Sequence, residues 1–117
     1  MKKILITGGA GYIGSMLCTK LINLGHKVTV IDLLKYDKNS LSHLFYSKNF
    51  KLIKEDVNNN KFMKKVLKDF DIIIPLAALV GAPLCDKFKK KAIKTNVETV
   101  KIIVKNLRKD QKIIYPT

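Results

Sequence analysis

Three glycines near the start of the chain have a spacing suited to binding a diphosphate. They are Gly8, Gly11 and Gly14, in the sequence Thr7-Gly-Gly-Ala-Gly-Tyr-Ile-Gly14. Glycine at the first position permits a tight turn, at the second the close approach of a diphosphate, and at the third close packing of a helix against a strand. The loop has no basic side chain, so backbone amides at the start of the following helix would hold the anion.

An acidic residue further along the chain extends this prediction from a diphosphate to a dinucleotide. Asp32 ends the next predicted strand, and its carboxylate can accept hydrogen bonds from both hydroxyls of an adenosine ribose. A carboxylate also repels a 2′-phosphate, which favours NAD over NADP, although Lys35 nearby leaves NADP open. The alternative is that Asp32 is an ordinary residue of the turn after its strand.

These residues must be positioned by elements that alternate between strand and helix. The predicted strands are residues 2–7, 27–32, 50–54, 71–75 and 112–115. The predicted helices are residues 12–24, 61–70 and 86–110, with a short helix around residues 41–45, and Gly25 is the signal that ends the first of them. The run Ile72-Ile-Ile74 does not alternate with polar residues, which is typical of a strand in a parallel sheet covered on both faces. We predict an α/β fold with a doubly wound parallel sheet of strand order 3-2-1-4-5.

Composition limits the class of protein. The chain has 117 residues, 47% hydrophobic and 27% charged, which is enough for one buried core. The longest apolar runs are shorter than the roughly 20 residues of a membrane span, and the first residues show no signal-peptide cleavage region. Cys18 and Cys85 have neither metal-ligand spacing nor the density of a disulfide scaffold. We expect a single cytoplasmic domain over residues 1–117, with free thiols and with neither a metal nor a membrane partner.

The net charge of +14 raises the question of a nucleic-acid partner. Within residues 86–110, apolar side chains recur at helical spacing, and lysines such as Lys101 and Lys105 fall on the opposite side. Arg108 is the only arginine, whereas base readout and stacking favour arginine, and the one aromatic residue of this segment, Phe88, falls on its apolar side and not on the lysine side. We interpret the lysines as a solvent-exposed surface, and binding to nucleic acid or another anionic surface is the weakest alternative function.

The sequence of residues 7–14 resembles the signature of the extended short-chain dehydrogenase/reductase family, specifically its NAD-dependent nucleotide-sugar epimerases and dehydratases. The resemblance runs the length of the chain. Glu55-Asp56-Val57 is similar to the family's adenine-contacting segment after the third strand, and Leu76-Ala77-Ala78 to its segment beside the cofactor after the fourth. Asn96 resembles an asparagine near the nicotinamide. The resemblance implies cofactor contacts by Gly8, Gly11, Tyr12, Ile13, Gly14, Asp32, Leu33, Asp56, Val57, Leu76, Ala77, Ala78 and Asn96.

Ordinary structural roles remain open for several of these residues. Asp56 could cap the following helix, and Ala77-Ala78 could let a helix pack closely. Asn96 lies on the apolar side of its predicted helix, where a buried amide needs a partner whatever its role. Pro75 and Thr99 depart from the family pattern, which commonly has histidine and glycine at these places. Because proline has no amide hydrogen, Pro75 should lie at the very end of its strand.

The resemblance also implies a catalytic pair that this sequence does not contain. In the family that this sequence resembles, a tyrosine acts as the base, and a lysine four residues later lowers the pKa of that tyrosine. None of the four tyrosines here, Tyr12, Tyr36, Tyr46 and Tyr115, is followed by a lysine at that spacing. We expect the truncated, N-terminal cofactor half of such an enzyme, unable to catalyse alone, with a nucleotide sugar as partner only in a full-length form.

Two further expectations concern partners. A fifth strand at the edge of the sheet would expose unpaired backbone groups and apolar surface, so we expect self-association through that edge. The alternative function to a shortened enzyme is an independent regulatory module in which bound NAD acts as a signal without any chemistry.

Overall fold

One parallel sheet organises the part of the chain that the computed structural model describes, which is residues 1–8, 12–32, 41–76, 98 and 100–114. Its five strands lie in the order β3-β2-β1-β4-β5 and are parallel throughout. Their bounds are β1 Lys3–Thr7, β2 Lys27–Asp32, β3 Phe50–Lys54, β4 Ile72–Pro75 and β5 Lys112–Ile113. The predicted fold class and strand order are therefore confirmed, and Pro75 ends its strand as expected.

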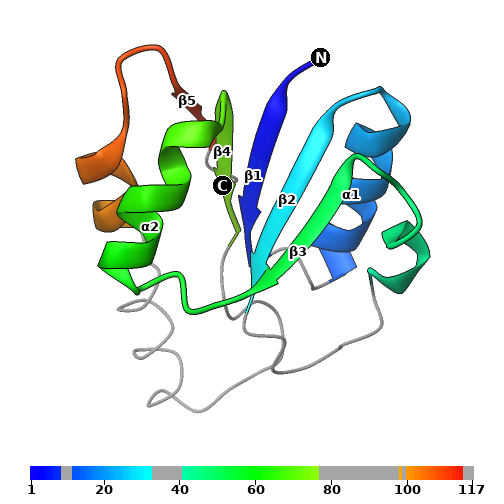
Figure 1. Cartoon of the computed structure of the whole chain (residues 1–117), viewed down its shortest axis with the longest axis horizontal. Coiled ribbons are helices and arrows are strands. Elements are labelled where there is room, and N and C mark those ends of the chain that lie inside the picture. Colours follow the sequence, from blue (N-terminus) through cyan, green and yellow to red (C-terminus); the bar gives the residue numbers. More distant parts are fainter. Residues whose placement is uncertain (9–11, 33–40, 77–97, 99, 115–117) are drawn as a thin grey trace.

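Helices cover both faces of the sheet, giving three layers (Figure 1). One face is covered by α1 (Tyr12–Asn23) and the short 3-10 helix η1 (Ser42–Leu44). The other is covered by α2 (Asn60–Val66), the 3-10 helix η2 (Leu67–Asp69) and a helix that includes residues 100–106. None of the helices in the described ranges is long and apolar enough to cross a membrane.

Alternation along β1 shows how the sheet supplies both cores. Ile4 and Ile6 pack with Cys18 on the α1 side, whereas Leu5 packs with Met63 on the α2 side. All five side chains are almost fully buried. Burying an aliphatic side chain of this size contributes about 1.5–3 kcal/mol, so β1 is held from both faces as well as from both edges.

The end of α1 follows the predicted glycine signal. Gly25 has a φ of +91°, the left-handed conformation that glycine adopts without a steric penalty. The amide of Gly25 donates to the carbonyl of Ile22 at 3.0 Å, and the amide of His26 donates to the carbonyl of Leu21 at 3.1 Å. These two bonds form a Schellman motif, which ends the helix and turns the chain into β2.

Two predicted helices end earlier than the sequence pattern suggested. The helix predicted over residues 61–70 is α2 followed by η2, so its last turn is 3-10. The helix predicted over residues 86–110 is helical over residues 100–106 but not over 107–110, and residues 86–97 lie outside the described residues. The amide of Arg108 donates to Oε1 of Gln111 at 2.7 Å, so a side chain takes a backbone donor where a continuing helix would use a carbonyl.

The two cysteines were expected to be free thiols. Cys18 is free and fully buried on the side of α1 that packs against the sheet, and burial raises the pKa of its thiol to about 12. A thiol with so high a pKa stays protonated near neutrality and is a poor nucleophile. Cys18 is therefore a packing residue, while Cys85 lies outside the described residues.

Gln111 links the end of η2 to the start of β5. Its Nε2 donates to the carbonyls of Leu67 at 2.5 Å and Phe70 at 2.7 Å, while its Oε1 accepts from Arg108. Gln111 is only 8% exposed, so these groups have little access to water. A buried polar group without a partner costs more than its hydrogen bond contributes, so this side chain fixes the approach to β5.

We predict that Gln111→Ala lowers the free energy of unfolding by about 2–3 kcal/mol, because it removes three hydrogen bonds from a site with little access to water. The measurement is urea denaturation followed by circular dichroism. Lys109→Ala, at an exposed neighbouring position, should change stability by less than about 0.5 kcal/mol. Equal stability of the two variants would contradict this role for Gln111.

Candidate functional site

The candidate site lies at the edge of the sheet where the parallel strands end. The register pairs Thr7 with both Ile31 and Pro75, and pairs Asp32 with Lys54, so the carboxyl ends of four strands meet there. This is the lower edge of the sheet in Figure 1. In doubly wound sheets, ligands bind outside these ends, at the point where the strand order reverses.

Gly8 directly follows β1. Both its backbone conformation and the small space beside it require glycine. Its φ is +74°, and a Cβ placed on it would lie 3.1 Å from the carbonyl oxygen of Leu76. Its amide donates to the carbonyl of Ile31 at 2.9 Å, while the amide of Leu76 donates to the carbonyl of Thr7 at 2.9 Å. The first glycine of the motif thus makes the predicted tight turn, locked between the ends of β2 and β4.

A buried hydroxyl lies beside this turn. Thr7 is 1% exposed, and its Oγ1 has no hydrogen-bond partner within the described part of the chain. Buried hydroxyls in proteins are normally paired with a protein group, an ordered water or a ligand. The end of β1 therefore has one polar atom that the described residues leave without a partner.

The start of α1 has the properties needed to bind an anion. Gly14 is buried, which suits the close helix packing predicted for the third glycine, whereas Ile13 is 63% exposed. The first turn of α1 contains no acidic residue. The first turn of a helix in general offers backbone amides and the positive end of the helix dipole to an anion, and no carboxylate of this turn would compete.

Asp32 and Asp56 lie at the ends of neighbouring strands. Asp32 is half-buried, and its carbonyl accepts the amide of Glu55 at 3.3 Å, so β2 and β3 stay paired to their ends. Asp56 is exposed, and its Oδ1 accepts the amide of Asn58 at 2.9 Å. Capping of α2, one of the roles considered for Asp56, is performed by Asn59, whose Oδ1 accepts the amide of Phe62 at 3.2 Å.

The structure brings together part of the predicted site. Gly8, Asp32 and Leu76 lie at or directly after the ends of three adjacent strands, and Asp56 and Val57 follow a fourth. Five predicted residues lie outside the described residues, as does the side chain of Tyr12; the five are Gly11, Leu33, Ala77, Ala78 and Asn96. Sequence patterns did not single out Thr7 or Lys54, because their places depend on burial and on strand register.

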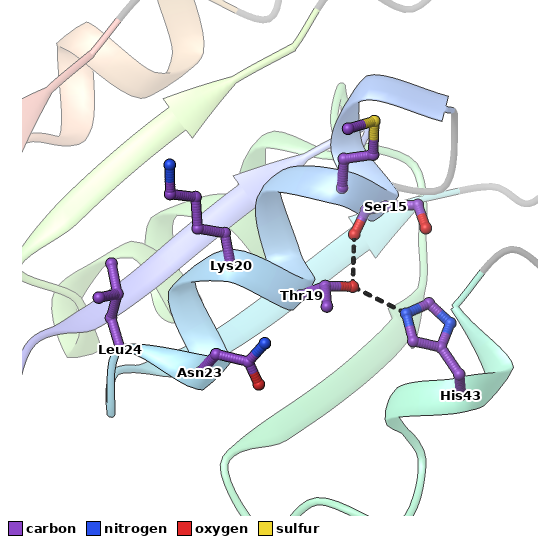
Figure 2. Close-up of a pocket in the computed structure, with 7 residues that line it drawn as sticks. Ser15, Thr19, Lys20, Asn23, Leu24 and His43 are labelled. Atoms are coloured by element: carbon purple, nitrogen blue, oxygen red, sulfur yellow. Dashed lines mark hydrogen bonds between the residues drawn. The ribbon is translucent and has the colours of Figure 1, made fainter.

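A separate groove lies on the outer side of α1 (Figure 2). It is lined by Ser15, Met16, Thr19, Lys20, Asn23 and Leu24 of α1 and its end, together with His43 of η1. Oγ1 of Thr19 donates to the carbonyl of Ser15 at 2.9 Å and lies 2.7 Å from Nε2 of His43. The groove is open to solvent and contains none of the predicted cofactor residues, so it is distinct from the candidate site.

Comparison with known proteins places the chain in a family. A model of the NAD dependent epimerase/dehydratase family matches residues 4–115. The chain therefore belongs to this family, and the resemblance stated from its motifs is confirmed.

Two individual proteins are similar in sequence to most of this chain. The UDP-N-acetyl-alpha-D-glucosaminuronate decarboxylase of Bacillus cytotoxicus is 32% identical over 115 residues, which cover 97% of this chain and 36% of that protein. UDP-glucuronic acid decarboxylase 1 of Arabidopsis thaliana is 41% identical over 97 residues, covering 81% of this chain and 21% of that protein. The chain thus spans about a third or less of the length of these relatives.

A solved structure supports the fold. The UDP-glucose-4-epimerase of Stenotrophomonas maltophila, crystallised with bound NAD and formylated UDP-arabinopyranose, superposes with a TM-score of 0.83 at 22% identity. The superposition covers 98% of this chain and 36% of that chain. The described sheet and helices therefore have the arrangement found in a nucleotide-sugar epimerase.

Gly8 and Gly25 provide a matched test of the turn. We predict that Gly25→Ala lowers stability by about 1–2 kcal/mol, the cost of a left-handed alanine. Gly8→Ala should cost at least about 1 kcal/mol more, because only there does the new Cβ meet a backbone oxygen. Thermal and urea denaturation measure the stability of both variants. If Gly8→Ala is the milder substitution, the described turn after β1 is wrong.

Proposed function

We propose that this chain is the NAD-binding portion of an epimerase/dehydratase-family enzyme that acts on a nucleotide sugar. The observation that carries the proposal is the gathering of Gly8, Asp32 and Leu76 at the carboxyl edge of one parallel sheet. Family membership supports NAD as the cofactor, since the family's enzymes are NAD dependent.

Each part of the dinucleotide has candidate partners in this chain. Backbone amides of residues 8–14 would hold the diphosphate, and the carboxylate of Asp32 would accept the hydroxyls of the adenosine ribose. Asp56 and Val57 would contact adenine. The remaining proposed contacts, toward the nicotinamide side, are Leu76, Ala77, Ala78 and Asn96.

The described residues fit such a ligand. At Gly8 the left-handed turn leads the chain out of β1 toward the predicted diphosphate loop, at a place where a side chain would collide with the carbonyl oxygen of Leu76. Thr7 adds a buried hydroxyl that lacks a partner among the described residues. Bound NAD would supply a hydride acceptor, and the residues of this chain would bind and orient it.

We propose that the chemical step needs residues that this chain does not contain. The sequence contains no Tyr-x-x-x-Lys pair, and we infer that the chain alone does not convert a nucleotide sugar. The relatives' names, UDP-sugar decarboxylases among them, support a nucleotide sugar as the substrate of the complete enzyme. We further propose a cytoplasmic location, as expected from the sequence.

Calorimetric titration with NAD tests this proposal. We expect Asp32→Ala to weaken binding by about 1.5–3 kcal/mol, the loss of hydrogen bonds to a charged group. Gly11→Val should abolish measurable binding, because a branched side chain would block the approach of the diphosphate.

Asp69→Ala is the matched control, because it removes an exposed carboxylate from η2, away from the strand ends. It should leave the affinity for NAD within about twofold. Wild-type affinity in both Asp32→Ala and Gly11→Val would refute the site.

A further inference from the structure

Lys54 lies beside Asp32 at the candidate site. The two residues are register partners at the ends of β3 and β2. The same register pairs Val30 with Leu52, and both of these side chains pack in the core on the α1 side. Because side chains alternate along a strand, Asp32 and Lys54, two residues further on, also share the α1 side of the sheet.

The distance between the two strands brings a cation close to the proposed ribose site. Neighbouring strands lie about 4.8 Å apart, less than the length of an extended lysine side chain. Lys54 is exposed, and the ion pair found in the described part of the chain joins Arg108 to Asp110 and does not involve Lys54. Its ammonium can therefore reach a group bound next to the Asp32 carboxylate.

We propose that Lys54 determines how the site treats the 2′ position of the adenosine ribose. A carboxylate alone disfavours a 2′-phosphate by repulsion, but a neighbouring ammonium attracts one. The pair Asp32 and Lys54 then accepts either substituent: the carboxylate binds the hydroxyl of NAD and the ammonium binds the phosphate of NADP. This inference rests on the proposed function, and it adds NADP to the ligands of the same site.

Position on the strand separates Lys54 from its nearest lysine neighbour on β3. Lys51 is also exposed, but it is paired with Thr29, and alternation puts it on the opposite side of the sheet from Lys54. Lys51→Met and Lys54→Met lower the net charge by the same amount, so an effect of net charge alone would be equal in the two variants. A specific contact with a 2′-phosphate requires Lys54 alone.

The test is calorimetric titration of wild type, Lys54→Met, Lys54→Arg and Lys51→Met with NAD and with NADP. Wild type should bind the two dinucleotides with dissociation constants within about tenfold of each other. Lys54→Met should weaken NADP binding about tenfold, the size of one charge-assisted hydrogen bond, and NAD binding less than about twofold. Lys54→Arg should retain NADP binding, and Lys51→Met should change neither constant by more than about twofold.

The outcomes separate this inference from the proposed function. If NAD binds but Lys54→Met leaves the ratio of NAD to NADP affinity unchanged, the role of Lys54 is refuted and the dinucleotide site stands. The same holds if Lys35→Met, and not Lys54→Met, causes the loss of NADP binding. If wild type binds neither dinucleotide, both proposals fail. Thermal denaturation of each variant identifies any loss that comes from unfolding.

Discussion

The position of β1 between β2 and β4 fixes where every proposed contact lies. Its backbone is hydrogen-bonded on both edges, and its alternating side chains enter both cores. At its end, the amide of Gly8 binds the carbonyl of Ile31, and the carbonyl of Thr7 accepts the amide of Leu76. The turn that follows is therefore tied to two neighbouring strands, which gives the proposed diphosphate-binding loop a rigid base.

Electrostatics at this edge differs from that of the surface as a whole. The chain carries a formal charge of +14, most of it on exposed lysines. The proposed diphosphate contacts, however, use peptide amides and a helix terminus, which attract an anion at a defined place. Side-chain charge enters where the ribose would lie, with Asp32 and Lys54 side by side. A strongly basic chain can thus coexist with a proposed site whose selectivity would depend on one carboxylate and one ammonium.

The sequence predicted most of the fold, because local patterns there agree with the tertiary structure. The bounds of β2 and β3 and the glycine-terminated end of α1 came from strand composition and a helix-stop signal. The sequence pattern did not predict where the helix before Gln111 ends, because the long-range hydrogen bonds of Gln111 to Leu67 and Phe70 override helical periodicity there. For the site, the motif predicted Gly8 and Asp32, whereas the place of Lys54 opposite Asp32 required the register between strands.

Amide chemical shifts during a titration with NAD test the central claim most directly, because they report contact residue by residue. If the dinucleotide binds at the carboxyl edge of the sheet, the largest changes should occur at Gly8, Gly14, Val57 and Leu76. Amides lining the groove outside α1, such as those of Thr19 and His43, should hardly change. Changes centred on that groove, or no changes at saturating NAD, would contradict the account.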